Sequence, residues 1–201
     1  QAEPLYRSAL AIRQRILGAD HPDVAESLHD LAGFHDQVGR FSEAADLYRQ
    51  AREILFRHLG SNHPDYAASL SAEAWHECRR GNLRQGETLA RQAFGIVEET
   101  RGASHPQRAS GAQLLSRIAL QQARIGEAEQ YALHVNEVRR EVLGERHHRY
   151  AGGLENLAFV RAMQGRGEEA ERLARQGIEI TRAALGERHP FYAEGLTAVG
   201  Y

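Results

Sequence analysis

Histidine is the residue whose spacing first suggests chemistry in this chain. Five histidines recur every 42 residues, at His21, His63, His105, His147 and His189, and imidazole nitrogen is a common zinc ligand. Side chains one repeat apart are separated by roughly 10 Å, the packing distance of neighbouring helices, whereas zinc ligands must lie within about 2 Å of one ion. The sequence therefore predicts no metal site, and we interpret these histidines as helix-start residues beside proline.

Cys78 is the only cysteine and would be the candidate nucleophile. A catalytic cysteine needs a neighbouring base, for which His35 or His76 could be considered, but no family signature surrounds Trp75-His76-Glu77-Cys78-Arg79. His76 and Cys78 are two positions apart on one predicted helix and point in different directions. We interpret Cys78 as an ordinary small residue and predict neither enzymatic activity nor a cofactor.

Charge and hydropathy exclude two further classes of partner. The 27 acidic residues outnumber the 25 basic ones, and basic pairs such as Arg79-Arg80 and Arg139-Arg140 stand alone, which disfavours nucleic-acid binding. No apolar run approaches the roughly 18 residues of a membrane span, and Gln1 leads directly into Leu5-Tyr6 without a signal segment. We expect a cytoplasmic protein with no membrane partner.

The chain is one unit repeated. Glycine marks the 42-residue register at Gly18, Gly60, Gly102, Gly144 and Gly186, each followed after two residues by the repeated histidine. A period of this length is typical of a solenoid, in which each unit packs on its neighbours and an extended surface carries the function.

Each 42-residue repeat is expected to hold two helices. Proline at position 22 suits the first turn of a helix, and apolar residues recur at steps of three and four until Gly39. After the Gly39-Arg40 turn, a second stripe closes at Leu59-Gly60. Further pairs are predicted at Pro64–Arg80 with Arg84–Thr100, Pro106–Gln122 with Gly126–Val142, and His148–Gln164 with Glu168–Ala184. With partial helices at residues 1–16 and Pro190–Tyr201, the sequence predicts an all-α fold of about nine helices.

The register also predicts the domain organisation. We expect a single array in which residues 1–18 end one repeat, residues 19–60, 61–102, 103–144 and 145–186 form four full repeats, and residues 187–201 begin another. Because both ends fall within a repeat, we expect the chain to be a fragment of a longer protein.

The repeat resembles the tetratricopeptide repeat, in its kinesin light chain-like class. The resemblance rests on His21-Pro22-Asp23-Val24-Ala25, Leu28-His29-Asp30-Leu31-Ala32 and Gly39-Arg40-Phe41-Ser42-Glu43-Ala44. It implies a right-handed superhelical solenoid of antiparallel helix pairs, with the first (A) helix of each pair lining a concave groove. In that family, paired asparagines on the A helices grip a cargo peptide, and of these only Asn156 is present here.

The same resemblance implies where a ligand would bind. The A-helix position that points into the groove holds Gly33, Trp75, Arg117, Phe159 and Tyr201. Aromatic and arginine side chains are the residue types that dominate protein-binding surfaces. Flanking groove positions are His29, Asp36, Ser71, Arg79, Gln113, Glu155, Asn156, Met163, Glu194 and Thr197. The alternative is that Trp75 and Phe159 pack between adjacent A helices and belong to the core.

We therefore expect an interaction scaffold whose groove binds a peptide segment or a partner domain, either of another protein or of its own polypeptide. The alternative function is a structural or self-association module of a larger signalling or effector protein, which binds through its ends or its convex face.

Overall fold

The computed structural model describes residues 2–102 and 105–199, and these ranges contain ten α-helices. In chain order they are α1 (Glu3–Leu17), α2 (Pro22–Gln37), α3 (Phe41–Leu59), α4 (Pro64–Arg79), α5 (Leu83–Arg101), α6 (Pro106–Gln121), α7 (Ile125–Leu143), α8 (His148–Met163), α9 (Gly167–Leu185) and α10 (Pro190–Val199). The sequence predicts about nine helices, and the four complete pairs together with one helix from each partial repeat make ten. The predicted helix bounds agree with the observed ones to within a few residues.

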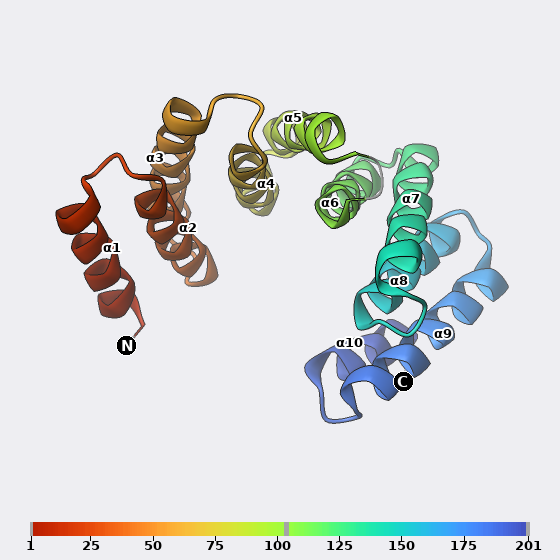
Figure 1. The fold of residues 1–201 in the computed structure, drawn as a ribbon. Coiled ribbons are helices and arrows are strands. Elements are labelled where there is room, and N and C mark those ends of the chain that lie inside the picture. The colour runs from red at the N-terminus through yellow and green to blue at the C-terminus, as the bar shows by residue number, and fades with distance from the viewer. Residues whose placement is uncertain (1, 103–104, 200–201) are drawn as a thin grey trace. The chain divides into compact units, whose positions relative to one another are not determined.

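The chain folds into two compact units, residues 1–100 and 101–201. In the first unit α2 packs against α3, and in the second α6 packs against α7 and α8 against α9, as the antiparallel hairpins in Figure 1 show. The A helices are thus α2 and α4 in the first unit and α6, α8 and α10 in the second.

The repeated histidines are the N-caps of the A helices. Nδ1 of His21 accepts a hydrogen bond from the Asp23 backbone N–H at 3.1 Å, and the other four histidines make the same bond at 3.1–3.2 Å. This bond satisfies one of the backbone donors that a helix start leaves unpaired. His147 makes it although His148 replaces the proline of the other repeats, so the histidine alone is sufficient for the cap.

Small residues form the core of each hairpin. Ala25, Ala32, Ala44 and Ala51 are fully buried in the first unit, and Ala128 and Ala132 are fully buried in the second. Side chains of this size allow two helices to approach closely, and larger residues such as Leu31 and Val160 fill the space between successive helices.

Charged and polar side chains join successive helices within each unit. Nδ1 of His76, on α4, lies 2.7 Å from Oδ1 of Asp36, on α2, and both residues are almost completely buried. In the second unit the guanidinium of Arg161, on α8, pairs with Glu129 on α7 and with Glu169 on α9. The almost completely buried guanidinium of Arg161 is therefore paired with two carboxylates, as burial of a charge requires.

Candidate functional site

The groove position predicted from the sequence carries exposed side chains on three A helices. Trp75 on α4 is 39% exposed, Phe159 on α8 is 57% exposed, and Arg117 on α6 is also exposed. Gly33 on α2 is half-buried. Phe159 is therefore largely open to solvent, whereas more than half of the Trp75 side chain is covered by the protein.

Some groove positions lie outside the described residues. Tyr201 is one of them, and so are the side chains of Glu194 and Thr197. Met163, on the last turn of α8, is exposed and follows Phe159 by one helical turn.

In the first unit, Arg79 lies one helical turn after Trp75 on α4. Its guanidinium donates to the backbone carbonyl of Asp36 at 3.0 Å and lies 5.6 Å from the centre of the Phe41 ring. The hydrogen bond and the cation–π contact hold the long side chain in place. Arg79 is thus an oriented, exposed cation beside an exposed indole.

The side chain of Asp36 is buried, although its sequence position predicts a residue of the groove. The residue is 5% exposed, and its carboxylate accepts from Tyr48 Oη at 3.4 Å as well as pairing with His76. Burial, together with the Asp36 carboxylate, raises the pKa of Tyr48. The side chain of Asp36 therefore belongs to the joint between repeats, and its backbone carbonyl positions Arg79.

His29 also links neighbouring A helices. Its Nε2 lies 3.0 Å from Ser69 Oγ on α4, and its ring meets the Tyr48 ring edge-on with centres 5.6 Å apart. Burial lowers the pKa of His29 to about 4, because the apolar surroundings disfavour the charged imidazole. At neutral pH, His29 is an uncharged part of this surface.

Asn156 plays the equivalent part in the second unit. Its Nδ2 donates to Ser116 Oγ on α6 at 3.1 Å, across the same 40-residue separation as the His29–Ser69 and Asp36–His76 contacts. A separation of 40 residues, two short of the repeat, brings side chains of adjacent A helices together. This separation is a sequence signal for candidate pairs, and the packing of the helices decides which of those pairs meet.

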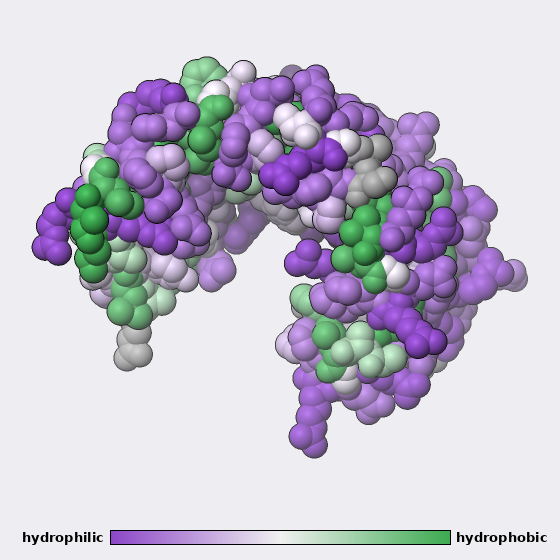
Figure 2. Space-filling model, viewed as in Figure 1, coloured by the Kyte–Doolittle hydropathy of each residue, from purple (hydrophilic) through white to green (hydrophobic). Residues whose placement is uncertain are grey.

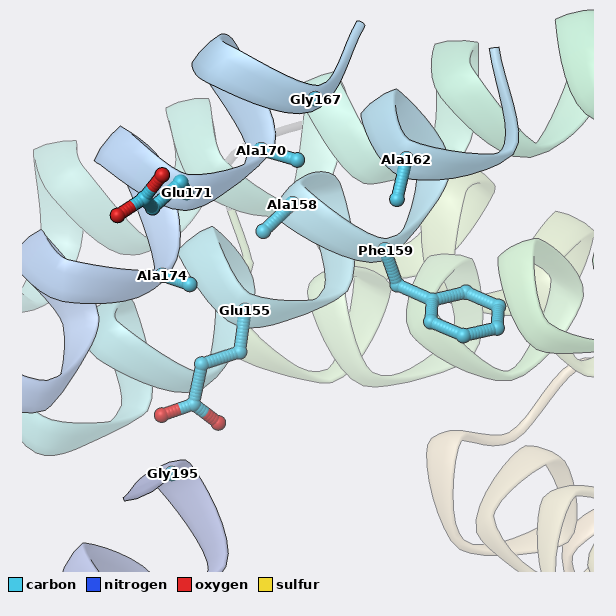
Figure 3. Close-up of a pocket in the computed structure, with 9 residues that line it drawn as sticks. All are labelled: Glu155, Ala158, Phe159, Ala162, Gly167, Ala170, Glu171, Ala174 and Gly195. Carbon is cyan, nitrogen blue, oxygen red and sulfur yellow. The ribbon is translucent and has the colours of Figure 1, made fainter. Parts of the chain in front are cut away.

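A shallow cavity of about 330 Å³ lies beside Phe159, between α8, α9 and α10. Its wall is made of small residues, among them Ala158, Ala162 and Ala174, and Figure 3 shows Phe159 and Glu155 extending from α8 next to them. The phenyl ring and the alanines together form an apolar area with a carboxylate at its edge.

A second cavity of the second unit contains residues that the sequence analysis did not select. Its volume is about 510 Å³, and Arg139, His148 and Arg149 line it together with the predicted groove residues Gln113, Arg117 and Glu155. In the sequence, Arg139-Arg140 is an isolated basic pair. The packing of α7 against α8 brings Arg139 to this cavity, and that packing cannot be read from neighbouring residues in the sequence.

The described residues contain no group of three or more histidine, cysteine, aspartate or glutamate side chains that could hold a metal ion. Cys78 is half-buried, and a Cβ atom built on Gly86 would lie 2.6 Å from its sulfur. The thiol therefore fills the space that a glycine leaves in α5. None of the described helices is long and apolar enough to span a membrane.

Known proteins with this architecture are helical repeat proteins. Two family models, both described as tetratricopeptide repeat, match residues 1–55 in one case and residues 109–149 and 151–191 in the other. No curated protein matches the chain in sequence with significance.

The solved structures point to a particular class of these repeats. The nearly identical TPR-like repeats of a protein assigned as a kinesin light chain in Podosopora anserina superpose with a TM-score of 0.76 at 26% identity, over 89% of this chain and 84% of that one. BtubC (BKLC) from P. vanneervenii superposes with a TM-score of 0.81 at 20% identity, over 97% of this chain and 77% of that one. The apo form of RapI shares the fold at 14% identity with a TM-score of 0.72, over 87% of this chain and 61% of that one.

Tetratricopeptide repeats are non-catalytic scaffolds for protein interaction. The family models together cover more than half of the chain, and the repeat register, the helix pairs and the solved structures agree with them. The chain therefore belongs to the tetratricopeptide repeat family, in its kinesin light chain-like class.

Proposed function

We propose that this scaffold binds peptide segments of a protein partner on the exposed and half-buried side chains of the A helices of each unit, which we call the A-helix surface. In the first unit these side chains are Trp75 and Arg79, with His29 at their margin. In the second unit they are Arg117, Phe159, Gln113, Glu155 and Asn156. Each segment can come from another protein or from the same polypeptide.

The exposure of Trp75 and Phe159 is the observation that carries the proposal. The two residues occupy the same repeat position, two repeats apart, and each leaves a large apolar side chain in water. Full burial of a large apolar side chain contributes roughly 1.5–3 kcal/mol, and the exposed fractions of 39% for Trp75 and 57% for Phe159 leave part of that free energy unused. A partner that covers these rings recovers that free energy on binding, which is why aromatic residues dominate binding hot spots.

The polar residues around the aromatic rings support the same function. Arg79 and Arg117 are exposed guanidinium groups, whereas Glu155 carries the opposite charge. A polar rim of both signs around an apolar centre is the usual composition of a protein-binding surface. We also propose the cytoplasm as the place of action, since a single cysteine suits a reducing compartment.

The test compares partner capture by the wild-type protein with capture by Trp75→Ala and Phe159→Ala variants. Captured proteins are identified by mass spectrometry, and their affinity is then measured with purified components. We expect each variant to lose about tenfold or more in affinity, the loss typical of a hot-spot residue, with an unchanged helical spectrum and melting temperature.

Phe56→Ala is the matched control, because Phe56 is half exposed but lies on the B helix α3. It should bind the partner as the wild type does. Equal capture by all four proteins would refute the assignment of the A-helix surface, and a large drop in melting temperature for Trp75→Ala would assign that residue to the fold.

Self-association is the second candidate function, and one observation favours it. Leu5 and Ile16 on α1 are 73% and 68% exposed, Ile12 is half exposed, and Figure 2 shows hydrophobic side chains gathered over this helix. An apolar helix face of this kind is a site for protein contact. Sedimentation analysis should then show concentration-dependent association of the wild type that is lost in Leu5→Glu/Ile16→Glu and kept in Val142→Glu, an exposed position on α7. Monomeric wild-type protein at all concentrations would exclude this function.

A further inference from the structure

The second cavity of the second unit is unusually rich in positive charge. Among the described residues that line it, three are arginines, at positions 117, 139 and 149, and one is a carboxylate, Glu155. They come from the A helices α6 and α8 and from α7, and His148 and Phe191 complete the wall. We call this site the arginine cavity. Its volume of about 510 Å³ lies within the range of roughly 300–1,000 Å³ that is typical of ligand sites.

Arg139 is held in place by neutral acceptors. One terminal nitrogen donates to the backbone carbonyl of Arg149 at 2.9 Å, and the other donates to Gln113 Oε1 at 2.6 Å. Burial, followed by the charge of Arg149, lowers the pKa of Arg139. These two hydrogen bonds position the guanidinium without neutralising it.

The first unit contains the same arrangement with its charge compensated. Arg13 is the residue three repeats before Arg139, and it donates to the backbone carbonyl of Asp23 at 2.9 Å as Arg139 does to Arg149. Arg13 also forms a salt bridge of 2.8 Å with Glu26. At the equivalent positions of the second unit, Arg149 corresponds to Asp23 and Gly152 corresponds to Glu26. Two positions that are acidic in the first full repeat are thus basic and neutral in the fourth.

Arg149 is unfavourable for the helix that carries it. It lies in the first turn of α8, where the partial positive charge of the helix end favours acidic residues such as Asp23 and Asp65 at the equivalent positions of α2 and α4. A cation here costs stability unless an anion offsets it. The fold therefore gains from an anionic ligand at this site and has no local need of the arginine.

Aromatic rings form one side of the arginine cavity. The His148 ring stacks on His147 with centres 4.4 Å apart and faces the Phe191 ring at 6.5 Å. Burial lowers the pKa of His148, and so do the neighbouring His147, Arg149, His189 and Arg139. An uncharged, flat wall of this kind suits the carbon atoms of a ligand whose charge meets the arginines.

We propose that the arginine cavity binds a phosphate monoester carried by a serine or threonine of the partner segment, an inference that rests on the proposed function of the A-helix surface. The guanidinium groups of Arg139, which is held by neutral acceptors, and of Arg149 carry two positive charges, which match the −1.5 to −2 of a phosphate monoester. Phosphate also offers three acceptor oxygens to the forked donors of arginine. A carboxylate carries one charge and two oxygens, so it leaves the cavity partly uncompensated.

The experiment uses three peptide libraries with identical mixed flanking residues and a central phosphoserine, serine or glutamate. Binding to the wild-type protein is measured by fluorescence anisotropy. The phosphoserine library should bind about tenfold or more tightly than either of the others, the difference expected from a charge-assisted hydrogen bond. Phenyl phosphate should compete with it, which separates recognition of the phosphate from recognition of the flanking residues.

The variants are Arg149→Asp, which introduces the acidic residue that Asp23 and Asp65 provide at the equivalent positions, and Arg117→Gln. Both should lose the preference for phosphoserine, and Arg149→Asp should keep or raise the melting temperature. Arg172→Gln is the matched control, since Arg172 is exposed on α9 outside the cavity. It should retain the preference.

Equal binding of the three libraries would overturn the inference, as would a preference that survives Arg149→Asp. Tighter binding of single-stranded nucleic acid than of phosphopeptide would also overturn it. The two proposals can fail separately. If partner capture is lost in Trp75→Ala but survives phosphatase treatment of the partner, only the proposed phosphate site is contradicted. Capture that is lost in Arg149→Asp but kept in Trp75→Ala and Phe159→Ala removes only the aromatic assignment.

Discussion

At the scale of single residues, most polar side chains that look available in the sequence are already engaged by the fold. Asp36 pairs with His76, His29 contacts Ser69, and Asn156 donates to Ser116. The exposed aromatic residues and arginines are different, because no position in the hairpin core requires them. This contrast separates the buried polar residues that join neighbouring helices from the exposed residues to which we assign the proposed binding.

The pKa of His29 makes the stability of the protein depend on pH. A folded-state pKa of about 4, against 6.5 for a free imidazole, means that the unfolded chain binds more protons between these values. The free energy of unfolding should therefore fall as the pH drops from 7 to 4, with a contribution from His29 of at most about 3 kcal/mol at 1.36 kcal/mol per unit. Urea denaturation at several pH values should show a shallower fall for His29→Gln, and identical slopes would contradict the role of burial.

Ala123 is a strained residue in the turn between α6 and α7. Its φ of 57° lies in the left-handed region, where the equivalent positions hold Gly39, Gly81 and Gly165. Because a side chain costs about 1 kcal/mol or more in this region, Ala123→Gly should raise the free energy of unfolding by about 0.5 kcal/mol after the entropy cost of glycine. Gly165→Ala should lower it by a similar amount. Thermal denaturation of both variants checks the pair, and shifts of the same sign would contradict the explanation.

At the scale of elements, the A helices depend on their histidine caps. His63→Ala removes the acceptor for the Asp65 backbone N–H and should lower the free energy of unfolding by about 1 kcal/mol. His63→Asn keeps an acceptor at the same place and should cost much less. Hydrogen exchange at the first turn of α4 measures the local effect, and equal losses in the two variants would show that the cap bond is unimportant.

At the scale of the whole molecule, a solenoid transmits a change only through neighbouring repeats. His76→Ala leaves the buried Asp36 carboxylate without its closest partner and should destabilise α2 to α4 by roughly 3 kcal/mol. Hydrogen exchange in α8 and α9, in the other compact unit, should remain close to that of the wild type. Uniform acceleration across all helices would instead show that the chain unfolds as one cooperative unit.

The sequence by itself determined the repeat, the hairpins and the helix starts. Caps, turn glycines and apolar periodicity act within about 20 residues, so Pro22, His63 and Gly144 report their local structure directly. The family resemblance also pointed to one repeat position on the A helices, and the structure has exposed side chains there at Trp75, Arg117 and Phe159.

Only the tertiary structure decided which polar residues meet. Asp36 is buried because His76 and Tyr48 lie on other helices, and Arg139 enters the arginine cavity because α7 packs against α8. Such contacts depend on how one helix is rotated against the next. Residues in the same repeat position therefore reach different partners when one side chain on the neighbouring helix differs. The charge of the arginine cavity therefore reflects Arg149 and Gly152 at the positions where the first full repeat has Asp23 and Glu26, a difference whose consequence is visible only once the helices are packed.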